Sequence, residues 1–226
     1  NPDPDQISFS SGLAGQVINI TGSNLRVLGR VTITGPSAGS VYVNDNSPTA
    51  TTGITFASFD LSPTGLSGST SISNFIFVGF DIGIDITNLV SGGFNFTRPL
   101  TIDNVQILNA GIAGIHMENS DIPFEIHNSI IVGTGVSESA GIDIFNSGQY
   151  LTTGQPISTG NIDSSHIGNS DLQSGNQIGG FVDGIRVQKS YFPDLRISGN
   201  TVGDLDIPNL REGIIEVELH DSAPNT

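Results

Sequence analysis

Five segments of this sequence are variants of one phrase, in which a glycine opens a short stretch of alternating apolar and polar residues. The phrase occurs at residues 83–86 (GIDI), 114–117 (GIHM), 141–144 (GIDI), 184–187 (GIRV) and, more loosely, 213–217 (GIIEV). The successive glycines are 31, 27, 43 and 29 residues apart. Because self-similarity at a period of about 20–50 residues is typical of solenoids, this repeat constrains the fold more than any other feature.

A second phrase precedes the first one and places apolar residues on both sides of a small polar residue. It occurs at residues 72–77, 102–107, 126–131, 162–167 and 197–202. Its third position is occupied by Asn74, Asn104, Asn128, Ser164 and Gly199. Asn and Gly tolerate the left-handed backbone region, so we expect a corner between two strands at this position. The variation in period is then assigned to loops such as residues 133–140 and 168–180.

The first 70 residues repeat less cleanly but contain the same short alternating strands. We expect them at residues 7–9, 17–20, 25–27, 31–33, 41–43 and 54–56, with loops at 48–53 and 62–69. The predicted fold is all-β, a single-stranded right-handed parallel β-helix (β-solenoid) of roughly seven to nine coils. We expect one domain over residues 1–226, with less regular first coils (1–70), regular coils (71–220) and a tail (221–226).

Stacking of the coils predicts rows of equivalent residues about 4.7–4.9 Å apart. Two rows of the glycine phrase are expected to point inward, namely Ile84, Ile115, Ile142 and Ile185, and then Ile86, Met117, Ile144 and Val187. The phrase closes on Asn88, Asn119 and Asn146, for which we expect a structural ladder of side-chain amides that bond to one another and to the turn backbone.

Composition excludes several classes of function. The chain has 7 Lys+Arg against 22 Asp+Glu, a formal net charge of −15. Nucleic acid is therefore not an expected partner, because phosphate binding requires a basic surface. The sequence has no cysteine, which excludes disulfides and thiolate metal sites. It also has no apolar run long enough to insert into a membrane.

The N-terminal residues resemble those of a known family. Residues 5–21 (DQISFSSGLAGQVINIT), 25–27 (LRV) and 30–36 (RVTITGP) look like the opening of bacterial surface β-helix proteins of the polymorphic outer-membrane and autotransporter-passenger type. The later phrases are similar to the general pectate-lyase-like β-helix repeat, so the resemblance covers essentially the whole chain. It implies a right-handed parallel β-helix that is secreted or located at the cell surface. The family includes adhesins, surface-layer components, polysaccharide lyases and phage depolymerases, so the resemblance leaves the activity open.

The outward position of the glycine phrase carries the residues with the most chemistry, Asp85, His116, Asp143 and Arg186. A His between two carboxylates is favoured in its protonated form. One interpretation is an acid–base cluster, as a lyase requires. The other is a ladder of complementary charges, in which each pair contributes about 0.2–1 kcal/mol. We favour the ladder, and we assign no residue as catalytic.

Other candidate sites are weaker. Glu118 and Glu125, or Asp81 and Asp85, would be a carboxylate pair for glycoside hydrolysis, but such pairs arise freely among 22 acidic residues. The histidines have no metal-ligand spacing, and no metal site or cofactor is predicted. Asp3 and Asp5, or Asp204 and Asp206, could bind calcium through their carboxylate oxygens, but a solvated acidic turn is the favoured interpretation. Asn19 and Asn95 match the glycosylation acceptor pattern.

A solenoid exposes unpaired strand edges at its two ends. The chain could be cut from a larger protein, its tails could cap the ends, or each end could pair with a second copy in a head-to-tail filament. For the filament, the contacts would come from Ile7, Phe9, Ile215, Val217 and Leu219.

These observations favour a non-enzymatic extracellular bacterial surface protein, either structural or adhesive. Its expected partner is a second copy of itself or a glycan of a host or cell surface. The alternative is a polysaccharide lyase or depolymerase that uses the row of Asp85, His116, Asp143 and Arg186. A third interpretation is a passive repeat segment of a larger adhesin.

Overall fold

The computed structural model describes residues 5–47, 51–57, 70–89, 99–120, 122–148, 166–167, 175–190, 192, 195–197, 199–203 and 215–219, and for 166–167 and 215–219 it describes the backbone alone. These residues form three parallel sheets of seven strands each. The expectation of an all-β chain with parallel sheets is confirmed.

Within each sheet, neighbouring strands in space come from successive coils. Sheet A contains, in spatial order, β1 (Asp5–Ser8), β4 (Val31–Thr34), β7 (Thr70–Ser73), β10 (Leu100–Asp103), β13 (Phe124–His127), β16 (His166–Ile167) and β19 (Arg196–Ile197). Sheet B contains β2 (Val17–Ile20), β5 (Val41–Asp45), β8 (Phe75–Val78), β11 (Gln106–Ala110), β14 (Ile130–Gly133), β17 (Gln177–Gly179) and β20 (Thr201–Val202). Sheet C contains β3 (Leu25–Val27), β6 (Thr52–Ala57), β9 (Ile82–Thr87), β12 (Ala113–Glu118), β15 (Ala140–Phe145), β18 (Asp183–Ser190) and β21 (Ile215–Leu219).

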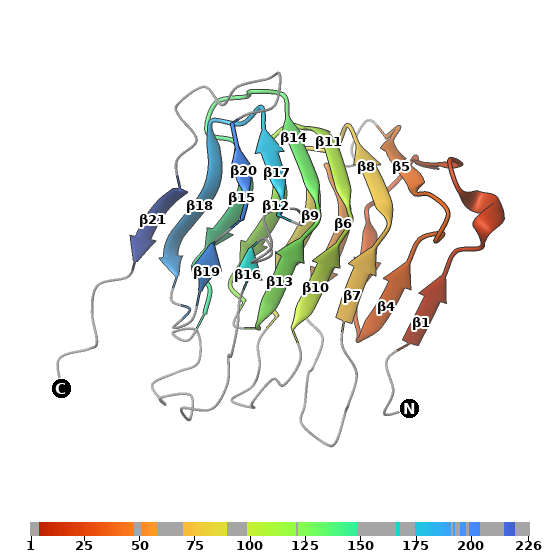
Figure 1. Ribbon diagram of the computed structural model, residues 1–226, viewed down its shortest axis with the longest axis horizontal. Helices are drawn as coiled ribbons and strands as arrows, with labels where there is room; N and C mark the ends of the chain where they lie inside the picture. The colour runs from red at the N-terminus through yellow and green to blue at the C-terminus, as the bar shows by residue number, and fades with distance from the viewer. Residues whose placement is uncertain are drawn as a thin grey trace, which may run out of the picture.

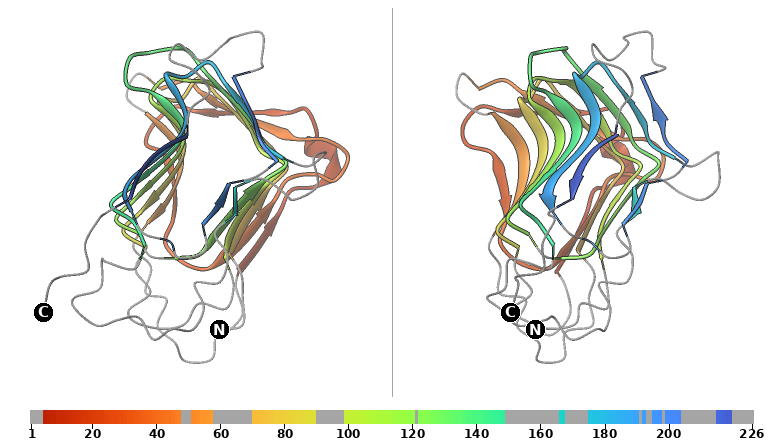
Figure 2. Two further views of the ribbon diagram at one scale, coloured as in Figure 1. Left: turned by 60° about the vertical axis from the view of Figure 1, so that its left-hand side comes forward. Right: turned by 90° about the vertical axis from the view of Figure 1, so that its left-hand side faces the viewer.

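The chain visits the three sheets in turn, because every strand pairs with the strand three positions later. The result is a three-sided prism in which the sheets run side by side from the first strands to the last (Figure 1). Seen closer to its long axis, the prism encloses an interior bounded by the three sheets (Figure 2). This arrangement is compatible with a β-solenoid.

The interior is filled by rows of apolar side chains in register. Ile115 pairs with Ile84 on one side and with Ile142 on the other, and Ile142 pairs in turn with Ile185. The second predicted row, which contains Met117, has the same register. All eight side chains are buried, so both predicted inward rows are confirmed. Burial of such rows supplies the main stabilisation of the fold, at about 25 cal/mol per Å² of apolar surface.

The glycine that opens the repeated phrase is required by close packing at the corner between sheets B and C. A Cβ atom on Gly114 would lie 2.1 Å from Cγ2 of Ile131 and 2.7 Å from the carbonyl oxygen of Gly141 in the next coil. Gly83 and Gly141 meet an isoleucine of sheet B in the same way. The periodic glycine therefore allows the sheet C strand to approach the interior isoleucine of sheet B.

The corner between sheets A and B requires a left-handed backbone. Asn74, Asn104 and Asn128 have φ angles of 62°, 50° and 53° between their two strands, and Gly199 has φ 67°. Asn104 Nδ2 donates to Asn74 Oδ1 at 2.6 Å, so side chains of successive corners are hydrogen-bonded. The predicted corner at these positions is confirmed.

Three details of the predicted boundaries are wrong. In the fourth copy of the corner phrase, it is Ile167 and not Ile162 that takes the row position, because Ile167 pairs with Ile126. The predicted loop 168–180 contains β17, whose Ile178 pairs with Ile131. The chain between β16 and β17 is longer than in the other coils, so a local pattern match placed the corner at Ser164. The predicted loop 48–53 also overlaps the start of β6.

Helical structure is limited, in the described part of the chain, to one 3₁₀ turn, η1 (Ser11–Leu13). Among the described residues there is no helix of the length and hydropathy needed to cross a membrane. The predicted loop 62–69 and residues 149–165 lie outside the described residues.

Candidate functional site

The outer face of sheet C carries one continuous row of polar side chains, one from each of four strands. Asp85, His116, Asp143 and Arg186 come from β9, β12, β15 and β18, and the strand register places each beside the next. We refer to these four residues as the charged row. In the same register, Thr55 of β6 precedes the row and position 216 of β21 follows it. The structure thus brings together the four residues that the sequence singled out.

The first half of the charged row is a histidine–aspartate pair. His116 Nδ1 donates to Asp85 Oδ1 at 3.0 Å, and the two side chains are 20% and 18% exposed. Their partial burial follows from the sheet, since each side chain lies between equivalent residues of the neighbouring coils. The pair is therefore shielded enough from water for its electrostatic coupling to matter.

The protonation of His116 depends on opposing effects. Burial disfavours the charged imidazolium and by itself lowers the pKa of His116. The hydrogen bond to Asp85 and the negative charges of Asp85, Asp143 and Glu118 outweigh that effect, and the pKa of His116 is raised above its ordinary value of 6.5. This direction agrees with the expectation for a histidine placed between two carboxylates.

The second half of the charged row is an arginine held by three acceptors. Arg186 Nε and Nη2 donate to the two carboxylate oxygens of Asp143 at 2.9 and 2.8 Å, a bidentate pair. Its Nη1 donates to Asp183 Oδ2 at 3.3 Å and to the carbonyl oxygen of Glu138 at 3.1 Å. The hydrogen bond with Asp143 is the largest cause of a raised pKa for Arg186, so the guanidinium stays charged. Planar bidentate pairing of this kind fixes both side chains.

The charged row has the geometry of a ladder, because each of its members contacts another member. A lyase-type base would have to be His116 acting beside Asp85, and a cation for an acidic sugar would have to be Arg186, which already binds Asp143 and Asp183. The predicted glycosidase pair of Glu118 and Glu125 is not assembled on one face, because Glu118 lies on sheet C and Glu125 on sheet A. Across the described residues, no group of three or more His, Cys, Asp or Glu could hold a metal ion.

The residues for which an asparagine ladder was expected directly follow the last residues of three sheet C strands. Asn88, Asn119 and Asn146 have φ angles of 55°, 49° and 46°. Asn146 Nδ2 donates to Asn119 Oδ1 at 2.6 Å, whereas Asn88 Nδ2 donates to Thr87 Oγ1 at 3.2 Å. The amide-to-amide bond thus joins the second and third positions, and the first amide bonds within its own strand end.

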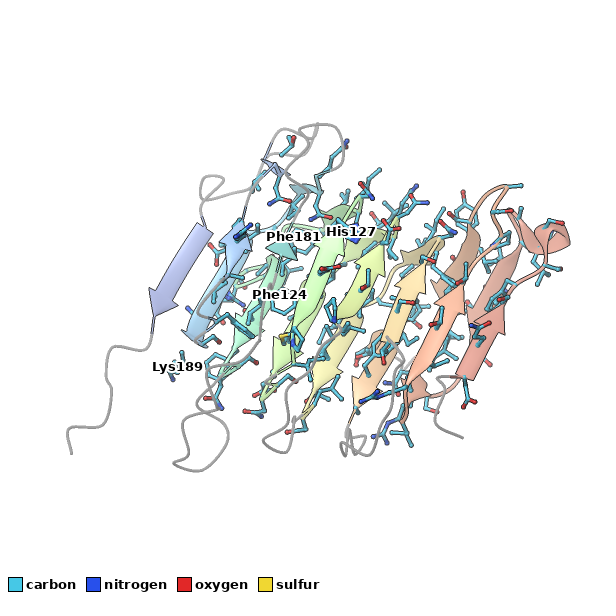
Figure 3. The ribbon with its side chains drawn as sticks, turned by 60° about the horizontal axis from the view of Figure 1, so that its bottom comes forward. Phe124, His127, Phe181 and Lys189 are labelled. Carbon is cyan, nitrogen blue, oxygen red and sulfur yellow. The ribbon has the colours of Figure 1, made fainter. Side chains whose placement is uncertain are left out.

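The equivalent position in the next coil, near the end of β18, is occupied by Lys189, the one lysine of the chain (Figure 3). It has φ 50°, in the left-handed region that a lysine seldom adopts. Its Nζ lies 5.1 Å from the centre of the Phe145 ring on the neighbouring strand, a cation–π contact. The Phe145 ring is partly exposed, and the ammonium group of the single lysine covers one of its faces.

A ladder of buried serines next to these asparagines was not predicted. The amides of Leu89, Ser120 and Ser147 donate to the hydroxyl oxygens of Ser120, Ser147 and Ser190, respectively, at 3.0–3.2 Å. Each hydroxyl donates in turn to the carbonyl oxygen two residues earlier, at 2.8–2.9 Å. The recurrence of Asn-Ser at 119–120, 128–129 and 146–147 was a signal in the sequence that could have indicated it.

The remaining predicted residues do not join the charged row. Ile7 is 47% exposed on β1, and the Phe9 ring packs edge-on against Phe75 at 5.2 Å. Asn19 is exposed on β2. The backbone of β21, which contains the assembly candidates Ile215, Val217 and Leu219, pairs with β18. The positions outside the described residues are Asn95, Asp3, Asp204 and Asp206.

The chain matches no protein-family model, no curated protein and no solved structure. Its function therefore has to be inferred from the residues and contacts described above.

Proposed function

We propose that this chain is a non-enzymatic extracellular surface protein with a structural or adhesive role, built on a single right-handed parallel β-helix of about seven to nine coils. The family resemblance of the N-terminal residues supports the bacterial cell surface or the extracellular space as its location. The three sheets, with strands paired one coil apart, support the β-helix.

The observation that carries the non-enzymatic role is the pairing within the charged row. Asp143 binds Arg186 through both oxygens, and His116 binds Asp85. A catalytic base or a substrate-binding cation must have a free lone pair or free donors directed at a substrate. In the charged row, Asp143 and Arg186 bind one another through both carboxylate oxygens, and His116 binds Asp85 through Nδ1. Cross-strand pairs of this kind stabilise a sheet.

The experiment is a turnover assay on a panel of acidic and neutral polysaccharides, read as new reducing ends and as unsaturated uronide products. We expect no product with the unmodified protein. Product formation that is lost in His116→Gln and kept in Thr101→Ala, on the outer face of sheet A, would overturn the proposal. That outcome would assign the chain to the second candidate, a polysaccharide lyase or depolymerase.

The specific observation in favour of that second candidate is the state of His116. A histidine hydrogen-bonded to a carboxylate, with a raised pKa, is also how a general acid is held in many enzymes. The turnover assay separates the two candidates because a charge ladder needs no substrate.

A filament is the assembled form that we propose for the structural role. The apolar side chains of the first coil, Ile7 and Leu25, are 47% and 42% exposed although their equivalents in later coils are buried. Stacking of a second copy on this edge would cover them. Electron microscopy of negatively stained protein, with and without calcium, tests this form. We expect unbranched fibres that are lost in Ile7→Asp, and dispersed short rods at high concentration would contradict it.

A further inference from the structure

The outer face of sheet B differs from the outer faces of the two other sheets. In one row Tyr42, Ile76, Gln106 and Ile130 lie side by side, one from each of four successive strands. In the parallel row, two residues further along each strand, lie Asn44, Val78, Leu108 and Val132. We refer to these eight residues as the outer B face, and six of them are apolar or aromatic.

Burial shows that these side chains point away from the interior. In β11 and β14 the residues alternate between partly exposed and buried, with Ile107 and Ile131 as the buried members. Ile76 is buried to 7% exposure, yet it does not belong to the core cluster, and the partly exposed Leu108 does not pack against that cluster. Because successive side chains of a strand alternate between faces, the outer B face is a second apolar surface of the same sheet.

The outer B face is also free of charge. The outward residues of β5, β8, β11, β14 and β17 in these two rows include no Asp, Glu, Lys, Arg or His. By contrast, the outer face of sheet A carries Asp103, Glu125 and His127, and the outer face of sheet C carries the charged row. In a chain with a net charge of −15, sheet B is thus the side on which two copies can approach without bringing like charges together.

We propose that the outer B face is an interface between two copies of this chain, packed sheet against sheet around a twofold axis. A twofold interface joins the same patch on both copies, so the patch must be complementary to itself. Apolar side chains and amides meet that condition, because an amide group both donates and accepts.

The size of the face fits a weak dimer. The four strands of the outer B face, about 4.8 Å apart and about five residues wide, give a footprint of roughly 300 Å², against about 800 Å² per partner in a standard interface. Ile112 and Val136 are 49% and 48% exposed in the connections that follow β11 and β14, at the border of this face, and they extend its apolar area. Association is therefore expected at high micromolar rather than nanomolar protein concentrations.

The test is sedimentation equilibrium of the full chain over a wide concentration range. We expect a reversible monomer–dimer equilibrium, weakened by about tenfold or more in Leu108→Glu, which places a charge at the centre of the face. Thr101→Glu, the same charge on the outer face of sheet A, is the matched control and should dimerise like the unmodified chain. A monomer at all concentrations, or a dimer unaffected by Leu108→Glu, would overturn the proposal.

Disulfide trapping provides a second measurement that does not depend on the folding of Leu108→Glu. The chain has no cysteine, so Gln106→Cys introduces a single thiol at the middle of the outer B face. We expect oxidation to give a covalent dimer from Gln106→Cys and none from Thr101→Cys. End-to-end stacking would leave Gln106→Cys uncoupled, so fibres without this cross-link would support the filament and contradict the sheet B interface.

Discussion

Arg186 on β18 binds both carboxylate oxygens of Asp143 on the neighbouring strand β15, at 2.9 and 2.8 Å, although the two residues are 43 positions apart in the sequence. Their side chains are 16% and 12% exposed, so the pair lies at the surface of sheet C but is largely screened from water. The longest insertion of the repeat lies between these two strands. The pair therefore joins the two coils that the sequence separates most.

Breaking this pair should cost more than an ordinary surface ion pair. We expect Asp143→Ala and Arg186→Ala each to lower the free energy of unfolding by about 1–3 kcal/mol, since a largely buried charge loses its partner. The double variant should lose less than the sum, with a coupling energy of about 1–2 kcal/mol. Urea unfolding of the four proteins measures the cycle. Strict additivity would mean that the pair is not coupled in solution.

Stability should depend on pH through His116. The folded-state pKa of His116 is raised above 6.5 by Asp85, Asp143 and Glu118, against the opposing effect of burial. Its stabilising contribution is therefore fully present below the unfolded-state value of about 6.5 and is lost as the pH rises through the folded-state pKa. The free energy of unfolding should fall over that window in the unmodified chain.

The matched protein for this titration is His116→Gln, which keeps the side chain polar but cannot ionise. The difference in unfolding free energy between the two proteins should decrease as the pH rises above the unfolded-state pKa of about 6.5 and through the raised folded-state pKa. A nuclear magnetic resonance titration of His116 itself gives the pKa directly. A value below 6.5, or a difference that grows with pH, contradicts the assigned direction.

The features that could be predicted from the sequence are those in which a backbone or packing constraint admits few residue types. The glycines of the phrase and the asparagines of the corners recur because close packing at Gly114 and a left-handed backbone at Asn104 allow few other residues. Register then follows from the period, and so the order of Asp85, His116, Asp143 and Arg186 could be read from the sequence. The coarse fold and the charged row were predictable for this reason.

The errors have equally definite causes. The segment between β16 and β17 is longer than in the other coils, so the pattern of the corner phrase was matched too early in the sequence. It assigned Ile162 to the inward row, whereas Ile167 is the residue that pairs with Ile126. The outer B face was missed because strands of a parallel sheet read as continuous apolar runs, as in residues 130–132, and such a run does not say which side chains face out. The contact of Arg186 with Asp183 depends on side-chain conformation, which the period does not determine.

Replacement of Gly114 by alanine tests the packing at the corner between sheets B and C. The added Cβ would lie 2.1 Å from Ile131 Cγ2 and 2.7 Å from the Gly141 carbonyl oxygen, so strand or side chain must move. We expect a loss of about 2–4 kcal/mol in the free energy of unfolding, at or above the usual cost of overpacking a core. Gly22→Ala, where no atom lies within 4 Å, should change stability by less than about 0.5 kcal/mol. Equal effects of the two substitutions would refute the packing argument.

The corner at Asn104 predicts a ranking of substitutions. Asn104→Ala forces a Cβ-bearing residue without a polar group into a φ of 50° and removes the bond to Asn74, at a cost of about 1–2 kcal/mol. Asn104→Gly relieves the backbone and loses only the amide bond, so it should destabilise less. Thermal unfolding ranks the three proteins. Asn46→Ala, at an exposed position of ordinary φ, is the control, and a glycine variant less stable than the alanine variant contradicts the ranking.

The serine ladder supplies acceptors for the buried backbone amides of the turns that follow the sheet C strands. Removing one hydroxyl should therefore destabilise the turn. Ser147 Oγ accepts from the buried amide of Ser120 at 3.2 Å and donates to the Phe145 carbonyl oxygen at 2.9 Å. Ser147→Ala leaves the Ser120 amide without its acceptor, whereas the Phe145 carbonyl oxygen still accepts from the Asn119 amide at 3.3 Å. The expected loss of unfolding free energy is about 1–3 kcal/mol. Amide hydrogen exchange should also accelerate at Ser120 more than at Ile115 in the adjoining strand. Ser71→Ala, on the outer face of sheet A, should stay within about 0.5 kcal/mol of the unmodified chain. If Ser147→Ala were as neutral as this control, water would have to replace the hydroxyl, and the ladder would not contribute to the stability of the turn.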